Sequence, residues 1–404
     1  MNPAFRDGGV FLKSTRPSLN IGVEEEYQTI DPSTRNLRSH IHAEIVQKGK
    51  TLLAERVKPE MHQSVIEIGT GVCRNIKDAK REMCAIRRQI ITLARQNGLR
   101  LAAAATHPFA RWSDQEIYPD DRYRTIVEDM KTVARANLIF GLHVHIGVED
   151  RETAVQIMNG ARYFLPHLLA LSANSPFWEG IDTGLRSYRC KVFDKFPRTN
   201  IPDLYRSWAE FEQYVNLLIR TNCIDDAKKI WWDIRPHPHF PTLEFRICDI
   251  PLRLDESIAI AALCQAIIAK LYRLHRQNLS FRHYSRALIM ENKWRAARYG
   301  LDGKLIDFGK QQEVPVRDLI REILDFVMEE AGDLGSKEEL TSIERILDEG
   351  NGAERQLRVF SETGDLNKVV DYTIEQTEQG LFEHADALES KHARHEAKTL
   401  GHAG

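Results

Sequence analysis

Imidazole, carboxylate and guanidinium side chains recur at alternate positions of short strand-like segments. His143 and His145 alternate with aliphatic side chains, and Glu244 and Arg246 do the same further along the chain. Side chains at positions i and i+2 of a strand share one face, so each pair is expected opposite the aliphatic groups. Glu67 repeats the pattern between two isoleucines. These groups bind divalent metal and phosphate.

Two further segments follow the same scheme. Glu24 and Glu26 are expected on one face of a strand, and Asp233 and Arg235 on one face of another. A sheet with a wet face explains any one segment equally well, but five segments together favour a site. Neighbouring carboxylates repel unless a cation lies between them. Carboxylates with imidazole suit Mg²⁺ or Mn²⁺, and adjacent arginines suit the phosphates that such ions carry.

The sequence also limits how a nucleotide can bind. No GxxxxGK[ST] loop occurs, and no GxGxxG motif follows a strand. Nucleotide binding must therefore use an antiparallel sheet rather than a parallel phosphate-loop fold. The net charge of −2 provides no general positive field for nucleic acid or an anionic membrane surface. An anionic ligand must be held by local arginines and metal.

Composition and length are those of a globular chain. The 404 residues are enough for one large domain or two smaller ones. The six cysteines form no CxxC pair, which favours reduced, mostly buried thiols in the cytoplasm. The N-terminus lacks the apolar core of a signal peptide, and the longest apolar stretch, residues 258–269, is too short to span a bilayer. We therefore expect a soluble cytoplasmic protein.

Apolar periodicity predicts the helices. Residues 75–97 have Asn75 as a candidate N-cap and end before Gly98. Residues 255–279 are apolar on most sides and predict a deeply buried helix. Helices are also predicted over residues 152–172 and 206–220, and every convincing segment from 283 onward is helical: 283–298, 315–331, 337–348, 354–361 and 365–379.

The chain is expected to divide into a main domain over residues 19–280, a helical region packed on it over 281–380, and a flexible tail over 381–404. Residues 1–18 are expected to form a loose arm. Four histidines in the tail allow a metal-binding interpretation, but a frayed, solvated end is favoured.

Seven motifs resemble, in order, those of the carboxylate–amine ligase family, often called type 2 glutamate–cysteine ligases, within the glutamine synthetase-like superfamily. The motifs are residues 22–27 (GVEEEY), 59–68 (PEMHQSVIEI), 106–109 (THPF), 141–145 (GLHVH), 172–176 (SANSP), 232–236 (WDIRP) and 242–246 (TLEFR). The resemblance covers residues 20 to 275 and weakly the helices beyond. It implies an α+β fold in which a curved antiparallel sheet of about six strands cradles the site, with helices behind it. It also suggests a homodimer.

The resemblance implies an ATP-dependent ligase that joins an amino acid carboxylate to an amine, with glutamate and cysteine as the substrates in the family name. Glu24 and Glu26 would each supply a carboxylate to one of two metal positions. The resemblance assigns Glu60 and Glu67 to the metal nearer the amino acid, although Glu60 also fits a plain loop carboxylate. It assigns His143 and Glu244 to the metal nearer the ATP phosphates.

The remaining roles concern the phosphates. The resemblance implies that Arg246 stabilises the phosphoryl group in flight and that His145 approaches the phosphates, and the strand pattern adds Arg235 to this group. Arg186 and Arg189 either bind a substrate carboxylate or phosphate as a bidentate fork, or are loop charges. Four other residues have a structural interpretation. Glu25 is expected to point away from the site, and Trp231 and Trp232 to belong to the core. For His107, a role in the site and a role in closing a turn are equally favoured.

The implied reaction converts the carboxylate into an acyl phosphate that an amine attacks, which requires alignment and charge neutralisation. Because an acyl phosphate hydrolyses readily, a loop must exclude water, and residues 107–124 and 174–202 are candidates. Three alternatives remain: a non-catalytic nucleotide or metal sensor, a guanidino-type phosphotransferase, and a metallohydrolase that uses His143 and His145. The glutamate-rich shell suits magnesium better than the zinc of such hydrolases.

Overall fold

The structure, a computed structural model, describes residues 16–40, 45–53 and 56–382 of the 404. Within these residues one seven-stranded antiparallel sheet forms the centre of the molecule, with the order β10-β11-β5-β1-β3-β2 and β4 paired to β1. Its strands are β1 (Ile21–Ile30), β2 (Val57–Pro59), β3 (Val65–Gly69), β4 (Arg100–Ala102), β5 (Leu142–Gly147), β10 (Ile234–Pro236) and β11 (Thr242–Phe245). The predicted antiparallel α+β sheet is confirmed, with seven strands rather than six.

The strict alternation of apolar and polar residues along the strands determines the two faces of the sheet. Val23 pairs with Val144, and Val144 pairs in turn with Phe245, so the aliphatic side chains of three strands meet on one face. These side chains are fully buried. Because a slip of one residue would turn the whole apolar set outward, the register is strongly specified. The same register places the alternate polar residues together on the other face.

Three helices cover the apolar face: α2 (Ile76–Gln96), α5 (Arg151–Ala161) and α9 (Leu254–Arg276). Asn75 caps α2 as predicted, because its side chain accepts a hydrogen bond from the backbone N–H of Asp78 at 2.9 Å. The single helix predicted over 152–172 is wrong. A 3₁₀ turn at 162–164 separates α5 from α6 (Leu165–Ser172), where Pro166 starts a new helix because proline cannot continue the previous one.

Helix α9 is long and apolar enough to cross a membrane by length and composition, and it is the one described helix that meets this test. The expectation that the apolar stretch 258–269 is too short to span a membrane therefore underestimated the length of the apolar helix. However, 83% of the most apolar window of α9 is buried within the protein. Its neighbours are the sheet, α2 and α5 on one side and two C-terminal helices on the other. It is accordingly the core helix that the sequence predicts.

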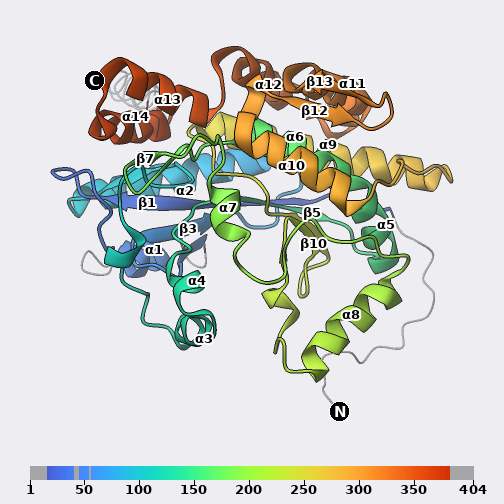
Figure 1. Ribbon diagram of the computed structural model, residues 1–404, viewed down its shortest axis with the longest axis horizontal. Helices are drawn as coiled ribbons and strands as arrows, with labels where there is room; N and C mark the ends of the chain where they lie inside the picture. Colours follow the sequence, from blue (N-terminus) through green and yellow to red (C-terminus); the bar gives the residue numbers. More distant parts are fainter. Residues whose placement is uncertain (1–15, 41–44, 54–55, 383–404) are drawn as a thin grey trace, which may run out of the picture.

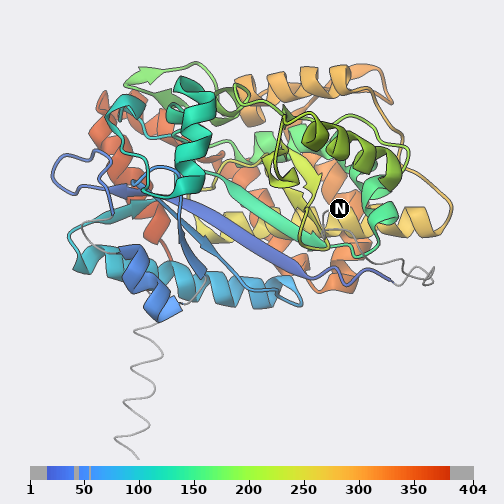
Figure 2. The same ribbon diagram turned by 90° about the horizontal axis from the view of Figure 1, so that it is seen from below.

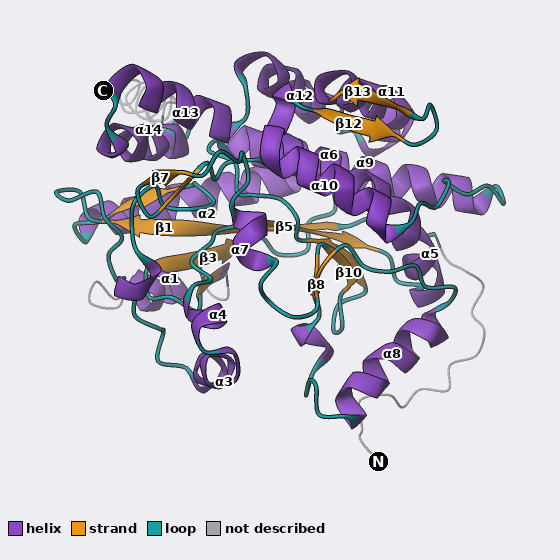
Figure 3. Cartoon of the chain, viewed as in Figure 1, coloured by secondary structure: helices purple, strands orange, loops and turns teal. Residues whose placement is uncertain are grey.

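The C-terminal region is mainly helical, as expected. It contains α10 (Arg286–Tyr299), α11 (Val316–Leu334), α12 (Lys337–Glu349), α13 (Gly352–Thr363) and α14 (Leu366–Glu378). Helices α11 and α12 pack on α9, and one continuous hydrophobic core extends from the sheet to these helices (Figure 1). A small hairpin of β12 (Lys304–Asp307) and β13 (Gln312–Pro315) was not predicted; it appears beside α11 and α12 in Figure 3.

The polar face of the sheet is left open between shorter elements. Helices α3 (Asp121–Met130), α4 (Thr132–Arg135) and α8 (Trp208–Arg220) lie on this side, and α7 (Arg189–Phe193) lies in front of β5 (Figure 1). Figure 2, seen from below, shows β1 in blue and β5 in green running side by side across the middle of this face. Most of the tail, residues 383–404 with its four histidines, and residues 1–15 of the arm lie outside the described residues.

The remaining short elements are α1 (Ile45–Leu53), the hairpin of β6 (Phe177–Trp178) and β7 (Ile181–Asp182), and the parallel pair of β8 (Thr199–Asn200) and β9 (Trp231–Trp232). The pair β8–β9 corrects the single strand expected over 231–235. The chain leaves β9 at Asp233 and joins the main sheet only in β10. All six cysteines lie in described residues and are free thiols, four of them buried, as expected.

Candidate active site

A cavity of about 600 Å³ opens on the polar face of the sheet. The walls include every residue expected to bind metal: Glu24, Glu26, Glu60, Glu67, His143 and Glu244. They also include four of the five residues expected at the phosphates or the substrate: His145, Arg189, Arg235 and Arg246. Six strands, or the residues next to them, supply these side chains except Arg189. Cross-strand pairing therefore brings together groups that are up to 222 residues apart in the chain, from Glu24 to Arg246.

Three carboxylates form a tight cluster at one end of the cavity. Glu26 on β1 stands directly opposite Glu67 on β3, and Glu60 follows β2. One oxygen of each lies within 4.8 Å of the others. Burial raises the pKa of Glu26 to about 7. Burial and the charge of Glu67 raise the pKa of Glu60 well above its usual value, and burial raises that of Glu67. The protein alone does not fully compensate the negative charge of these three carboxylates.

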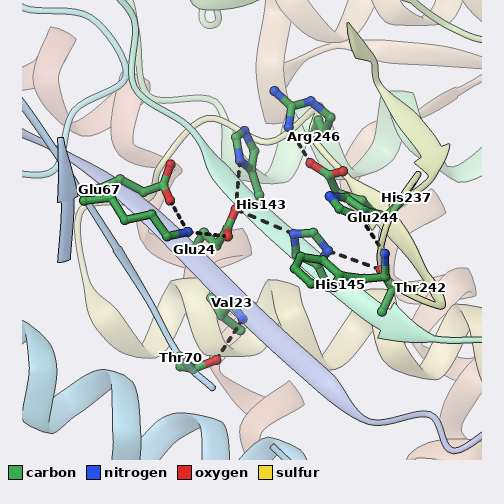
Figure 4. Close-up of polar contacts among 12 residues, drawn as sticks. Val23, Glu24, Glu67, Thr70, His143, His145, His237, Thr242, Glu244 and Arg246 are labelled. Atoms are coloured by element: carbon green, nitrogen blue, oxygen red, sulfur yellow. Dashed lines mark hydrogen bonds and ion pairs between the residues drawn. The ribbon is translucent and has the colours of Figure 1, made fainter. Parts of the chain in front are cut away.

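Glu24 organises the middle of the cavity, between β3 and β5 (Figure 4). Its Oε2 lies 3.6 Å from His143 Nδ1 and 3.6 Å from His145 Nε2. Burial opposes the charge of Glu24, but the two imidazoles hold its pKa well below the usual value. Burial and the charge of Arg246 lower the pKa of His143 to about 4, so its ring is neutral at pH 7 and keeps a lone pair. Despite its burial, the contact with Glu24 raises the pKa of His145.

Glu244 holds two arginines at the other end. Its Oε2 accepts from Arg235 Nε at 2.7 Å, and its Oε1 accepts from Arg246 Nη1 and, at 3.3 Å, from Arg235 Nη2. Burial alone would raise the pKa of Glu244, but the two guanidinium groups hold it well below the usual value. An ionised carboxylate with up to four lone-pair positions can hold both arginines and still face a cation.

Arg189 reaches the cavity from α7 rather than from the sheet. Its Nη1 donates to the carbonyl of Ile247 and its Nη2 to that of Arg246, both at 3.2 Å. Behind it, the buried Asp249 accepts hydrogen bonds from Ser175 Oγ at 2.7 Å and Ser187 Oγ at 2.9 Å. The guanidinium is thereby held in a fixed position on the side of the cavity where its charge lowers the pKa of Glu26.

Arg186 does not join the site. It is absent from the cavity walls and lies against the C-terminal region, where a Cβ on Gly300 would be 2.9 Å from its Cγ. Its backbone N–H donates to the carbonyl of Ala297 at 2.7 Å. The motif spacing that made Arg186 and Arg189 look equivalent is interrupted by the start of α7, which turns only Arg189 toward the sheet.

Four structural interpretations can be compared with the structure. Glu25 points into the core, where it lies 3.9 Å from Arg87, as expected. His107 closes a turn, because its Nδ1 accepts from the backbone N–H of Ala110 at 2.9 Å. Trp232 is in the core, but Trp231 is only half-buried and lines the cavity, contrary to expectation. The reason is that consecutive side chains of the short strand β9 point to opposite faces.

Lys58 and His237 line the cavity but were missed from the sequence. Lys58 lies two positions before Glu60 and opposite Glu67, so the same alternation that selected the carboxylates could have found it. Its Nζ is 2.9 Å from Glu67 Oε1 and 3.5 Å from Glu24 Oε1. His237 follows β10 and stacks on Phe240, with ring centroids 4.5 Å apart.

A second cavity of about 330 Å³ adjoins the first near the hairpin of β10 and β11. The two share Arg235, His237, His239 and Phe240 in their walls. Aromatic side chains of α8, Trp208 and Phe211, line the second cavity. Of the two candidate lids, residues 107–124 contribute Asp120, Arg122 and Tyr123 to the first cavity, and residues 174–202 contribute Phe193 and Phe196 in addition to Arg189.

The sequence is highly similar to two proteins that it matches over most of its length. A protein of Solibacter usitatus (strain Ellin6076) named "Putative glutamate--cysteine ligase 2" is 80% identical over 371 residues, which cover 92% of this chain and 96% of that protein. A protein of Herpetosiphon aurantiacus with the same name is 56% identical over 363 residues, covering 90% of this chain and 94% of that protein.

Solved structures share the fold at low sequence identity. The crystal structure of glutamate–cysteine ligase from Francisella tularensis, in complex with AMP, has a TM-score of 0.64 at 14% identity, covering 95% of this chain and 93% of that one. A bifunctional glutathione synthetase from Pasteurella multocida has a TM-score of 0.63 at 14% identity, covering 90% and 53%. The family model for glutamate–cysteine ligase family 2 matches residues 20–372, and the chain belongs to this family.

Proposed function

We propose that this protein is an ATP-dependent ligase that joins the carboxylate of an amino acid to an amine, with glutamate and cysteine as the first pair to test. One observation carries the proposal: six metal-type ligands from five strands, or the residues next to them, line one cavity on one face of the sheet together with Arg235 and Arg246. Family membership supports the reaction class. The names of the relatives support the first substrate pair.

The donor set fits divalent cations. Three carboxylates within 4.8 Å of one another are mutually repulsive, and a hard cation with oxygen ligands relieves that repulsion. Glu26, Glu60 and Glu67 would hold Mg²⁺ or Mn²⁺ at one end. Glu24, the neutral His143 and Glu244 would hold it at the other. Bound ions would neutralise phosphate oxygens and keep them aligned for transfer.

The arginines and His145 would bind the phosphates of ATP. Arg235 and Arg246 are held side by side by Glu244, so their positions are fixed before substrate binds. Such preorganised charge stabilises a phosphoryl group in transfer without reorganisation. The γ-phosphoryl group moves to the substrate carboxylate, ADP leaves, and the amine then displaces phosphate from the acyl phosphate.

Arg189 would bind the amino acid substrate. It lies on the side of the three-carboxylate cluster, and two backbone carbonyls and the Asp249 network hold it in place. A guanidinium can bind a carboxylate through two parallel hydrogen bonds. An acidic amino acid, with a carboxylate to anchor and another to activate, fits this arrangement.

The second cavity would hold the nucleotide base. It adjoins the phosphate-binding end through Arg235, and its walls carry Trp208, Phe211 and Phe240. Apolar and aromatic walls with a few polar groups are typical of sites for a flat heterocycle. The segments that carry Tyr123 and Phe196 would cover the other end, and their closure would protect the acyl phosphate from water.

The test is a screen of amino acids against amines with ATP and Mg²⁺, measuring ADP release and identifying the conjugate by mass spectrometry. Amide formation with stoichiometric ADP supports the proposal. ATP binding without ADP release for any mixture would indicate a sensor, and a stable phosphorylated product would indicate a phosphotransferase. Product formation without ATP would indicate a hydrolase working in reverse.

Two variants locate the chemistry in this cavity. Glu67→Gln and Glu244→Gln should each lower ADP release by at least about a hundredfold while the fold is retained, because each removes a charge from a different end. Glu128→Gln, on the exposed surface of α3, is the matched control and should retain wild-type activity. Wild-type rates in both cavity variants would refute the metal-site assignment.

A further inference from the structure

Lys58 occupies the space between the two groups of candidate metal ligands. It is on the edge strand β2, opposite Glu67 on β3. Its ammonium lies 2.9 Å from Glu67 Oε1 and 3.5 Å from Glu24 Oε1. Glu67 belongs to the three-carboxylate cluster, whereas Glu24 contacts the two histidines. One cation therefore pairs with a carboxylate of each group.

The arginines of the cavity are engaged elsewhere. Arg235 and Arg246 pair with Glu244, and Arg189 donates to the carbonyls of Arg246 and Ile247. Arg122 lies over the ring of Tyr123, 5.5 Å from its centroid. Among the described residues that line the cavity, Lys58 is thus the cation in ion-pair contact with Glu24 and Glu67.

An ammonium and a divalent ion cannot both use the same carboxylate oxygens at these distances. They would compete for the same lone pairs and repel each other at close range. Lysine has a long flexible stem and a compact charge, and the Lys58 side chain is 46% exposed. It can therefore leave the carboxylates for solvent without disturbing the core.

We propose that Lys58 is an internal counter-cation that occupies the carboxylates Glu24 and Glu67 in the metal-free protein and is displaced when divalent ions bind. The proposal rests on the metal assignment made under Proposed function. Its consequence is that Lys58 stabilises the metal-free site and weakens metal affinity, so that the site fills only when free metal is plentiful.

The test measures Mn²⁺ binding to the full chain by isothermal titration calorimetry, without substrate. Lys58→Met keeps the length of the stem and removes the charge, and should bind Mn²⁺ about two- to fivefold more tightly than wild type, as expected for a partly exposed ion pair. Lys228→Met is the matched control, because Lys228 lines the same cavity and is exposed but forms no ion pair with Glu24 or Glu67 in the structure. It should change affinity less than about twofold.

Equal or weaker Mn²⁺ affinity in Lys58→Met, or an equal gain in Lys228→Met, would overturn the proposal. A second readout is thermal unfolding: in EDTA, Lys58→Met should melt below wild type, and its rise in melting temperature on adding Mn²⁺ should be larger. The outcome is separable from that of the proposed function. A shift in affinity without ADP release would leave Lys58 in this role and refute the ligase. If the wild-type protein releases ADP but Lys58→Met leaves the Mn²⁺ affinity unchanged, the ligase proposal stands and the proposed role of Lys58 is refuted.

Discussion

Glu26 and Glu67 stand directly opposite each other on β1 and β3, where Glu67 is buried, Glu26 is half-buried and two like charges are unfavourable. Glu60 adds a third carboxylate oxygen within 4.8 Å. Proteins rarely place acidic groups this way without a cation or a proton between them. The arrangement therefore destabilises the folded state when neither protons nor divalent ions are bound, and binding of either relieves the repulsion.

The first prediction concerns the pH dependence of metal-free stability. Burial raises the pKa of Glu26 from 4.5 to about 7, so the folded state binds a proton here that the unfolded state has lost. This contribution to stability is fully present below pH 4.5 and is lost as pH rises through 7. In EDTA, the free energy of unfolding of wild type relative to Glu26→Gln should fall from pH 5 to pH 8, as measured by urea denaturation.

The comparison with Glu26→Gln is needed because buried histidines act in the opposite direction. Burial lowers the pKa of His62 and His107 to about 4, and such groups add stability as pH rises toward 6.5. These histidines are present in both proteins and cancel in the difference. Saturating Mn²⁺ at pH 8 should restore wild-type stability. A difference that stays constant or rises with pH would contradict the assignment of Glu26.

The second prediction concerns Arg246. Replacing it with alanine should lower the rate of ADP formation by about 10²- to 10³-fold, because it removes a donor aimed at developing charge. Affinity for a non-hydrolysable ATP analogue should change much less, since Arg235 remains on Glu244 at 2.7 Å. Single-turnover rates and equilibrium binding separate the two effects. Loss of affinity alone would make Arg246 a ground-state ligand of the phosphates.

Much of the site was accessible from the sequence, for a physical reason. Period-2 alternation both selects the residues of the polar face and guarantees that neighbouring strands bring them together. Glu24 opposite His143 and Glu67 opposite Glu26 follow from that pattern once the strands pair. The helices behind the sheet were found because their apolar faces are long and periodic, as Asn75 and the buried α9 illustrate.

Other features were not encoded in local periodicity. The break after Trp232 depends on pairing with residues 199–200, which no local pattern reveals. Arg186 and Arg189 differ only because a short helix begins at Arg189. The hairpin of β12 and β13 was missed because each strand has four residues and β13 is largely exposed, so neither carries a clear apolar alternation. Contacts with segments distant in the sequence determine each of these three features.

The third prediction tests Gly141 as the link between Glu26 and Arg189. The backbone N–H of Gly141 donates to Glu26 Oε2 at 2.6 Å, and a Cβ at this position would overlap Arg189 Nη2. Gly141→Ala should therefore displace the guanidinium and raise the KM for the acidic substrate by about tenfold or more, the cost of one charge-assisted hydrogen bond. Steady-state kinetics with the amino acid varied would measure this.

A double-mutant cycle distinguishes this route from general damage to β5. If Gly141→Ala acts through Arg189, it should add little to the effect of Arg189→Met, because the displaced group is already gone. Additive effects of the two substitutions would instead place the damage in the strand or in Glu26. Melting temperatures of all four proteins should be compared alongside the kinetics.

The last prediction concerns Lys293, through which the C-terminal region supports the site. Lys293 on α10 is 1% exposed, and its Nζ lies 2.8 Å from Asp233 Oδ2 and 3.1 Å from Asp194 Oδ1. The carbonyl of Asp233 accepts the backbone N–H of Arg246 at 2.8 Å. Lys293→Met would leave Asp233 uncompensated inside the protein, whereas Asp194 would keep its pair with Lys191 at 3.2 Å, and should cost about 3–5 kcal/mol of unfolding free energy in urea denaturation.

The companion variants decide whether charge or packing is responsible for the loss. Adding Asp233→Asn to Lys293→Met removes the uncompensated charge and should recover a substantial part of the stability, because the penalty comes from the unpaired carboxylate of Asp233. Lys304→Met breaks an exposed pair with Glu313 and should change stability by less than about 0.5 kcal/mol. If the double variant is no more stable than Lys293→Met, the lysine stem rather than its charge holds α10 to this part of the site.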